Sequence, residues 1–164
     1  GAYGRGTVYK ITSAGAHTLL HSFGGSNGAN PTAGLIADSA GSFYGTTQNG
    51  GAYGSGTVYR ITSAGAHTLL HSFDGSDGSS PYAGLAADGL GSFYGTTQNG
   101  GANDKGTVYK ITSAGVHTLL RSFDGSDGAA PAAALIADGA GNLYGTTLSG
   151  GANGKGTVYR FPAQ

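Results

Sequence analysis

Two loops of this chain carry paired aspartates, which are common ligands of Ca²⁺ in proteins. The sequence Asp-Gly-Ser-Asp-Gly occurs at residues 74–78 and returns at 124–128. Two carboxylates in a glycine-rich loop supply hard oxygen donors, so a calcium site is one interpretation. Its candidate ligands are Asp74, Asp77, Asp124 and Asp127. We favour an ordinary turn and no cofactor, because the first repeat has Gly24 and Asn27 at these positions and Asp and Gly dominate turns.

The histidines are the other residues that could bind a metal ion: His17, His21, His67, His71 and His117. All fall in segments that read as the outer strand of a sheet. Two histidines four residues apart on one face of a strand are separated by about 13 Å, which is too far for one ion. Arg121 also replaces histidine in the third repeat. We therefore interpret the histidines as edge or surface groups.

The loops after the second and fourth strands of each repeat collect aromatic, amide and acidic side chains. Because neighbouring strands run in opposite directions, these loops are expected at one end of the sheets. Aromatic rings beside amides and carboxylates suit a carbohydrate or a peptide. The candidate ligand-binding residues are Tyr3, Tyr53, Asn103, Asn153 and Tyr82. The simpler interpretation is a solvated turn region that binds nothing.

Nothing in the sequence predicts a catalytic system. The glycine clusters lie between strands, not ahead of a helix, so they indicate neither a nucleophile elbow nor a dinucleotide site. The eight acidic residues are all aspartates, so a paired-carboxylate glycosidase would need two aspartates from separate loops. We therefore expect a protein that is not an enzyme.

A repeat of fifty residues positions all of these candidates. GAYGRGTVYK at 1–10 returns as GAYGSGTVYR at 51–60, GANDKGTVYK at 101–110 and GANGKGTVYR at 151–160. Fixed-period similarity of this kind marks a repeat architecture. A single repeat domain therefore spans 1–164, with complete repeats at 1–50, 51–100 and 101–150 and a partial one at 151–164.

Each repeat predicts four short strands separated by turn residues, and no segment has a helical period. In the second set the strands are expected at Tyr82–Ala87, Ser92–Gln98, Gly106–Thr112 and Val116–Phe123. Strict alternation places His117, Leu119, Arg121 and Phe123 on one face of the fourth strand. Four antiparallel strands per repeat describe an all-β fold of β-propeller blades. A β-solenoid or an open stack of small sheets is the competing interpretation.

Composition excludes several classes of partner. The formal net charge is zero, which gives nucleic acid or an anionic membrane no basic patch. No apolar stretch approaches the roughly 20 residues of a membrane-spanning helix, so no membrane insertion is expected. Cysteine is absent, which removes disulfides and thiolate metal sites, and the 34 glycines lack the period of collagen.

The sequence resembles a known family at this point. The motifs G-T-V-Y-[KR]-I-T and H-T-L-L-H-S-F-D-G-S-D-G are similar to the GloVer (Gloeo/Verruco-type) tandem repeat of bacterial surface or secreted proteins. The resemblance implies an extracellular or cell-surface location and carries no defined activity. The recurring Asp-x-x-Gly-x-x-Tyr segment also resembles NHL and SMP-30-like blades, which implies a propeller.

Ring closure then predicts self-association. Propellers have four to eight blades, so three repeats leave two apolar end faces open. We expect the ring to be closed by oligomerisation, with a C₂ dimer of six blades favoured over a filament or a fragment of a longer ring. The third strand is present in surplus, at Gly6–Thr12 and again at Gly156–Pro162. One copy must be displaced, or one sheet must gain a fifth strand.

These observations predict a non-catalytic, self-assembling scaffold, a structural or interaction module of a surface or secreted protein. Two alternatives remain open. The first is a lectin-like binder of carbohydrate or peptide that uses the loop face. The second is a designed or excised repeat. The near-identical repeats and the initial Gly1 favour this alternative.

Overall fold

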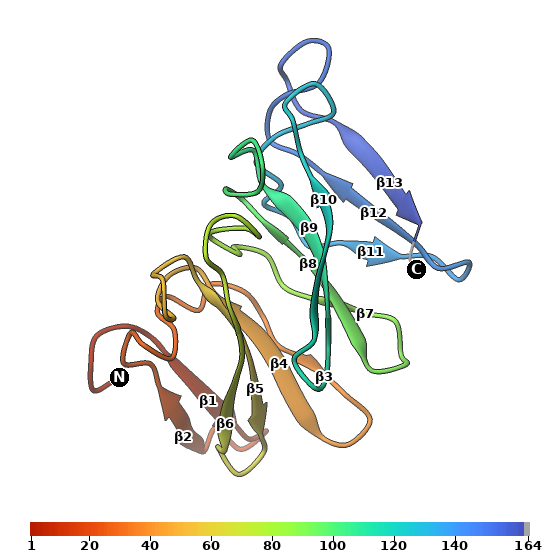
Figure 1. Ribbon diagram of the computed structural model, residues 1–164. Coiled ribbons are helices and arrows are strands. Elements are labelled where there is room, and N and C mark those ends of the chain that lie inside the picture. Colours follow the sequence, from red (N-terminus) through yellow and green to blue (C-terminus); the bar gives the residue numbers. More distant parts are fainter. Residues whose placement is uncertain (163–164) are drawn as a thin grey trace.

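The computed structural model describes residues 1–162 as a series of small antiparallel β-sheets. Four sheets follow one another in sequence order as an open arc, with the N-terminal and C-terminal sheets at its two ends (Figure 1). The described residues contain no helix, and so none that could cross a membrane. The strands are β1 (Thr7–Ile11), β2 (His17–Ser22), β3 (Ile36–Ala37), β4 (Ser42–Thr47), β5 (Thr57–Thr62), β6 (His67–Ser72), β7 (Ala86–Ala87), β8 (Ser92–Thr97), β9 (Thr107–Thr112), β10 (His117–Ser122), β11 (Ile136–Ala137), β12 (Asn142–Thr146) and β13 (Val158–Pro162).

The two interior sheets have four strands each, in the orders β3-β4-β5-β6 and β7-β8-β9-β10. The N-terminal sheet contains only β1 and β2, and the C-terminal sheet contains β11, β12 and β13. Equivalent strands pair in the same register, since Phe43 faces Ile61 and Phe93 faces Ile111. The prediction of an all-β fold with four antiparallel strands per repeat is therefore confirmed for the interior sheets.

In three of the four sheets the first strand (β3, β7 or β11) is much shorter than predicted, with two residues. The expected strand Tyr82–Ala87 is reduced to the pair Ala86–Ala87. The residues ahead of it lie against the preceding sheet, where Thr46 Oγ1 donates a hydrogen bond of 3.1 Å to the carbonyl oxygen of Ala83. Because that carbonyl is used between sheets, the segment does not extend the ladder with β8.

The fourth strand departs from the strict alternation expected from the sequence. In β6, Leu69 pairs with Tyr59 and His71 pairs with Val58, so Leu70 is an extra residue at a β-bulge. The same shift occurs in β2 and β10. An extra residue reverses the alternation beyond it. His117 and Arg121 therefore lie on opposite faces of β10, and the predicted shared face is wrong.

Neighbouring sheets pack face to face through buried aromatic and aliphatic side chains. Between the two interior sheets, Phe73 of the first contacts Tyr109 of the second, with ring centroids 5.1 Å apart in an edge-to-face arrangement. Phe23 with Tyr59 and Phe123 with Tyr159 repeat this contact at the other two junctions. Each fully buried ring stabilises its junction by about 3 kcal/mol through burial of apolar area.

Hydrogen bonds close the turns and link the sheets. Asp38 Oδ1 accepts hydrogen bonds from the backbone N–H groups of Ala40 and Ser42, and the equivalent Asp88 and Asp138 do the same. The hydrogen bond from the Ser42 N–H contributes most to lowering the pKa of the Asp38 carboxyl. These aspartates therefore cap the turn between the first and second strands of each sheet.

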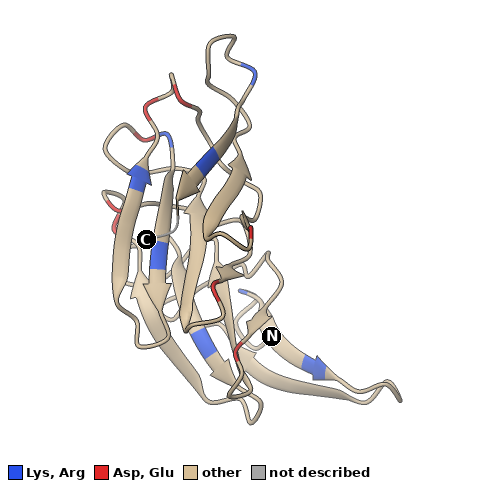
Figure 2. Cartoon of the chain, turned by 90° about the vertical axis from the view of Figure 1, so that its right-hand side faces the viewer, with Lys and Arg blue, Asp and Glu red and all other residues tan. Residues whose placement is uncertain are grey.

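Charges are distributed evenly along the arc. The acidic residues lie in turns and loops, whereas a basic residue occupies the same position in each third strand (Figure 2). These are Lys10, Arg60, Lys110 and Arg160. The repeat therefore disperses both signs of charge along the arc.

Removal of one buried hydroxyl should stabilise the protein. Tyr109 Oη is buried, hydrogen-bonds no residue within 1–162, and lies where a Cβ at Gly95 would overlap it. Because an unpaired buried hydroxyl costs about 1–3 kcal/mol, Tyr109→Phe should raise the free energy of unfolding by about 1 kcal/mol in urea titrations. The matched variant Tyr44→Phe should instead lower it by about 1 kcal/mol, because Tyr44 donates to Asp38 at 2.9 Å. A loss of stability in Tyr109→Phe would contradict this account.

Candidate functional site

The bulge in β6 directs its two histidines toward different neighbouring sheets. In β6, His67 faces the preceding sheet and stacks on His21, with ring centroids 4.1 Å apart. His71 faces the following sheet and stacks on His117 at the same distance, with 3° between the ring planes. The predicted position of both histidines on one face is therefore wrong, although β6 is an edge strand as expected, and adjacent repeats bring their histidines together in pairs.

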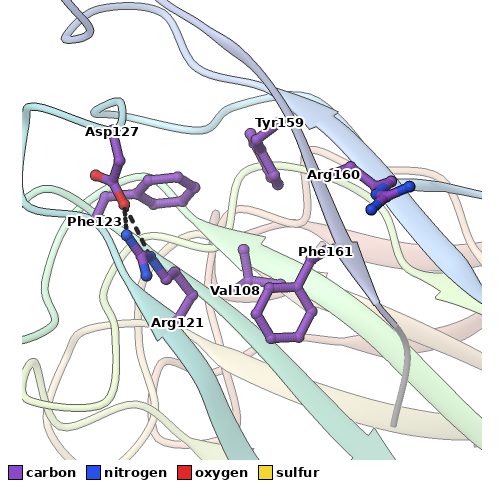
Figure 3. Close-up of a pocket in the computed structure, with 7 residues that line it drawn as sticks. All are labelled: Val108, Arg121, Phe123, Asp127, Tyr159, Arg160 and Phe161. Atoms are coloured by element: carbon purple, nitrogen blue, oxygen red, sulfur yellow. Dashed lines mark hydrogen bonds and ion pairs between the residues drawn. The ribbon is translucent and has the colours of Figure 1, made fainter.

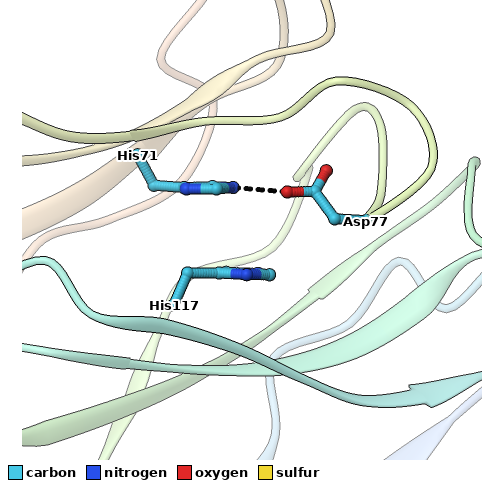
Figure 4. Close-up of side chains that lie close together, drawn as sticks. All are labelled: His71, Asp77 and His117. Atoms are coloured by element: carbon cyan, nitrogen blue, oxygen red, sulfur yellow. Dashed lines mark hydrogen bonds and ion pairs between the residues drawn. The ribbon is translucent and has the colours of Figure 1, made fainter.

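The second of these pairs includes a carboxylate. Asp77 Oδ2 lies 2.7 Å from His71 Nε2, and His117 stacks directly beside His71 (Figure 4). One donor atom from each of the three side chains lies within 4.8 Å of the others. His71 comes from β6, His117 from β10 and Asp77 from the loop after β6, so the cluster joins the two interior sheets.

Burial keeps one histidine of this cluster neutral. It lowers the pKa of His117 to about 4, and the neighbouring His71 adds to the decrease while Asp77 and Asp74 oppose it. His117 Nε2 is itself buried and has no hydrogen-bond partner within residues 1–162. At neutral pH the cluster therefore combines an uncharged imidazole, a second imidazole and a carboxylate.

The other sheet junctions lack part of this combination. At the first junction Asn27 takes the place of Asp77, and its Nδ2 lies 2.9 Å from His21 Nε2. At the last junction Arg121 replaces the first histidine and forms an ion pair with Asp127. Within residues 1–162, only the middle junction brings two histidines and a carboxylate together.

The predicted calcium ligands are engaged in their own turns. Asp74 Oδ1 accepts hydrogen bonds from Ser76 Oγ and from the backbone N–H groups of Ser76 and Asp77. Asp77 Oδ1 accepts one from the backbone N–H of Asp74 at 3.0 Å. Asp124 and Asp127 repeat the pattern. The hydrogen bond from the Ser126 side chain contributes most to lowering the pKa of Asp124 to about 2. The Oδ1 atoms of these aspartates therefore stabilise their own turns. Asp77 Oδ2 instead contacts His71 in the histidine cluster.

The residues predicted to bind a carbohydrate or a peptide occupy separate places. Tyr3, Tyr53, Asn103 and Asn153 are equivalent positions of successive repeats, so each belongs to its own loop, and all four are exposed. Asn103 Nδ2 donates to the backbone carbonyl of Phe123 at 3.3 Å. Tyr82 is also exposed, and its carbonyl oxygen accepts a hydrogen bond from Thr32. The repeat thus distributes these side chains along the arc.

A cavity of about 270 Å³ lies between the last interior sheet and the C-terminal sheet (Figure 3). Its apolar walls include Phe123 from the segment after β10 and Tyr159 and Phe161 from β13, and the Arg121–Asp127 ion pair lies at its side. At the middle junction the equivalent space beside His71, Phe73 and Tyr109 is filled by His117 of the fourth strand. The C-terminal sheet has no fourth strand within residues 1–162, and the cavity marks its place.

The fold and these junctions define an all-β tandem-repeat protein made of stacked antiparallel sheets. The sequence model of the Gloeobacter/Verrucomicrobia repeat matches residues 1–164, and the chain belongs to that repeat family. Comparison with curated proteins finds no match. This match supports the repeat motifs identified in the sequence and the tandem-repeat organisation of the chain.

Proposed function

We propose that this chain is a non-catalytic structural module that associates with further copies of itself through its two end sheets. The proposed assembly is a ring of β-propeller blades, with two chains and six blades as the favoured form. The proposed setting is the bacterial surface or the extracellular space, where such a ring would act as a scaffold.

The two end sheets are complementary parts of one blade. The N-terminal sheet contains strands equivalent to the third and fourth of an interior sheet, and the C-terminal sheet contains the first three. The strands β1 and β13 occupy equivalent positions in the repeat. If β1 of a second copy takes the place of β13 beside β12, β2 completes the blade as its fourth strand.

The observation that carries the proposal is the exposure of side chains that the interior sheets bury. Tyr9 is 56% exposed, whereas the equivalent Tyr109 is 0% exposed. Ile11 is exposed in the same way as Tyr9. Apolar surface of this kind favours a partner that restores the interior contacts, and a second copy carries the matching residues.

The cavity at the C-terminal sheet matches a side chain of the N-terminal sheet. His17 is equivalent to His117, and it stacks on Tyr9 with ring centroids 5.1 Å apart. In an added blade, His17 would occupy the space beside Phe123 and the Arg121–Asp127 ion pair, as His117 does beside Phe73. The same head-to-tail contact made twice would close a two-chain ring with C₂ symmetry.

The arrangement of the interior sheets supports the propeller geometry. Their shortest strands lie at one edge of each sheet, where β7 and β11 of adjacent sheets approach each other. Propeller blades converge in this way on a central channel. The small residues Ala86 and Ala87 of β7 suit such a narrow position.

Solution mass tests the proposal directly. Sedimentation velocity of the purified chain should give twice the mass of one chain over a wide concentration range. Tyr9→Asp places a carboxylate on the exposed end face and should yield the mass of a single chain, because a desolvated charge at the junction costs several kcal/mol. Circular dichroism of the variant should remain that of a β protein, since Tyr9 is already exposed in the single chain.

Tyr53→Asp provides the matched control. Tyr53 is also an exposed tyrosine, but it lies in a loop away from the end face, so its replacement should leave the mass unchanged. A wild-type mass of one chain at every concentration would exclude the assembly. A dimer that Tyr9→Asp leaves intact would exclude this end face as the interface.

A further inference from the structure

We propose that His71, Asp77 and His117 form a binding site for a divalent transition-metal ion, with Zn²⁺ the ion to which their donors are best suited. This inference is independent of the self-association proposed above. It rests on three side chains that the middle junction brings together from two sheets and a loop (Figure 4).

The donor set has the chemistry of a zinc site. Two imidazole nitrogens and one carboxylate oxygen are common protein ligands of Zn²⁺, and three such ligands leave a fourth position for water. The two carboxylate oxygens of Asp77 make different contacts. Oδ1 accepts a hydrogen bond from the Asp74 N–H in the turn, and Oδ2 contacts His71. His117 Nε2 is buried with no partner within residues 1–162, and a bound ion would give it one.

Metal binding requires a small rearrangement of the cluster. The three donor atoms lie within 4.8 Å of one another, and tetrahedral ligands of zinc are separated by about 3.4 Å. The parallel rings of His71 and His117 must tilt until their lone pairs converge, and Asp77 Oδ2 must exchange its contact with His71 for the metal. The inference requires these movements to come from rotations about the side-chain torsions.

An ion can reach the site from solvent. The side chains of His71 and Asp77 are about one-fifth exposed, at 19% and 21%, while the Nε2 atom of His117 is buried. A bound ion would join β6 to β10 and so clamp the two interior sheets together. Ligands that bind only the folded state stabilise it by mass action, so the ion should also raise the melting temperature.

The first junction supplies an internal control. His21 and His67 stack there as His71 and His117 do, but Asn27 stands where Asp77 would be. Asp77→Asn therefore reproduces an arrangement that the chain already folds with. Asn27→Asp should conversely create a second site of the same kind.

Isothermal titration calorimetry with ZnCl₂ tests the inference on the full chain. The wild type should bind one Zn²⁺ per chain, Asp77→Asn should bind at least about 100-fold more weakly, and Asn27→Asp should bind two. The 100-fold figure is a lower bound, because loss of a residue that merely orients a ligand already costs 10–100-fold. Asp127→Asn is the matched control, because Asp127 faces Arg121 and its replacement should leave one site.

Melting curves with and without ZnCl₂ give a second readout. The melting temperature of the wild type should rise with Zn²⁺, and that of Asp77→Asn should not. A wild type that binds no Zn²⁺ would overturn the inference. Equal affinity in the wild type and Asp77→Asn would also overturn it, because the ion would then be held by histidines elsewhere on the surface. A single site in a folded Asn27→Asp would contradict the role assigned to the carboxylate.

Discussion

Phe73→Ala should lower the free energy of unfolding by about 3–5 kcal/mol, the largest effect that we expect from a single substitution in this chain. Phe73 is fully buried at the middle junction. Its ring packs edge-to-face against Tyr109 and also contacts His71 and His117. Truncation to alanine removes these contacts and leaves a cavity that the flanking backbones cannot fill. Urea titration followed by circular dichroism measures the change.

The same substitution should also divide the unfolding transition. In repeat proteins each unit contacts only its neighbours, so stability is a sum of unit and junction terms. Weakening the middle junction uncouples the sheets on either side, and a broadened or two-step transition is expected. Leu90→Ala is the control, because Leu90 is 90% exposed and its removal should change stability by less than about 0.5 kcal/mol. A small effect of Phe73→Ala would mean that the sheets do not pack against each other.

The repeat made the sheet architecture predictable. The repeats share most of their turn glycines and most of their apolar positions, so four antiparallel strands per unit follow from the sequence. The first strand was overestimated because its polar backbone groups can also bond to the neighbouring sheet, as Ala83 does with Thr46. A pattern within one repeat contains no information on that contact between repeats.

The histidine cluster was not predictable by the same reasoning. Strict alternation along β6 places His67 and His71 on one face, too far apart to share an ion. The bulge at Leu70 turns them toward opposite neighbours, and each then meets a histidine of another repeat. A useful signal was present in the sequence, since residues 71 and 117 are nearly one repeat apart and both precede an aspartate loop. Its interpretation required the positions of adjacent sheets.

Burial of His67 makes the stability of the protein decrease as the pH falls. His67 faces His21 across the first junction and stacks beside Tyr59 of its own sheet, and its Nε2 is buried with no hydrogen-bond partner within residues 1–162. Burial, with a further contribution from His21, lowers the pKa of His67 to about 4 in the folded state, below the value of 6.5 for an exposed histidine. The unfolded chain therefore binds more protons between these values. The contribution of neutral His67 to stability is fully present above pH 6.5 and is lost as the pH falls toward 4.

His67→Phe should flatten this part of the pH profile. Phenylalanine retains the stacked ring on His21 but cannot bind a proton, so the variant should lose about 1–2 kcal/mol less than the wild type between pH 6.5 and 4, after allowance for the partial exposure of His67. Urea midpoints measured across this range in the presence of EDTA give the comparison. The turn aspartates act in a separate window, because hydrogen bonds lower the pKa of Asp138 to about 2 and its contribution is lost only as the pH falls from 3.8 toward that value. Parallel profiles for the wild type and His67→Phe above pH 4 would show that the first junction takes up protons freely, and that its histidines are not held neutral by packing.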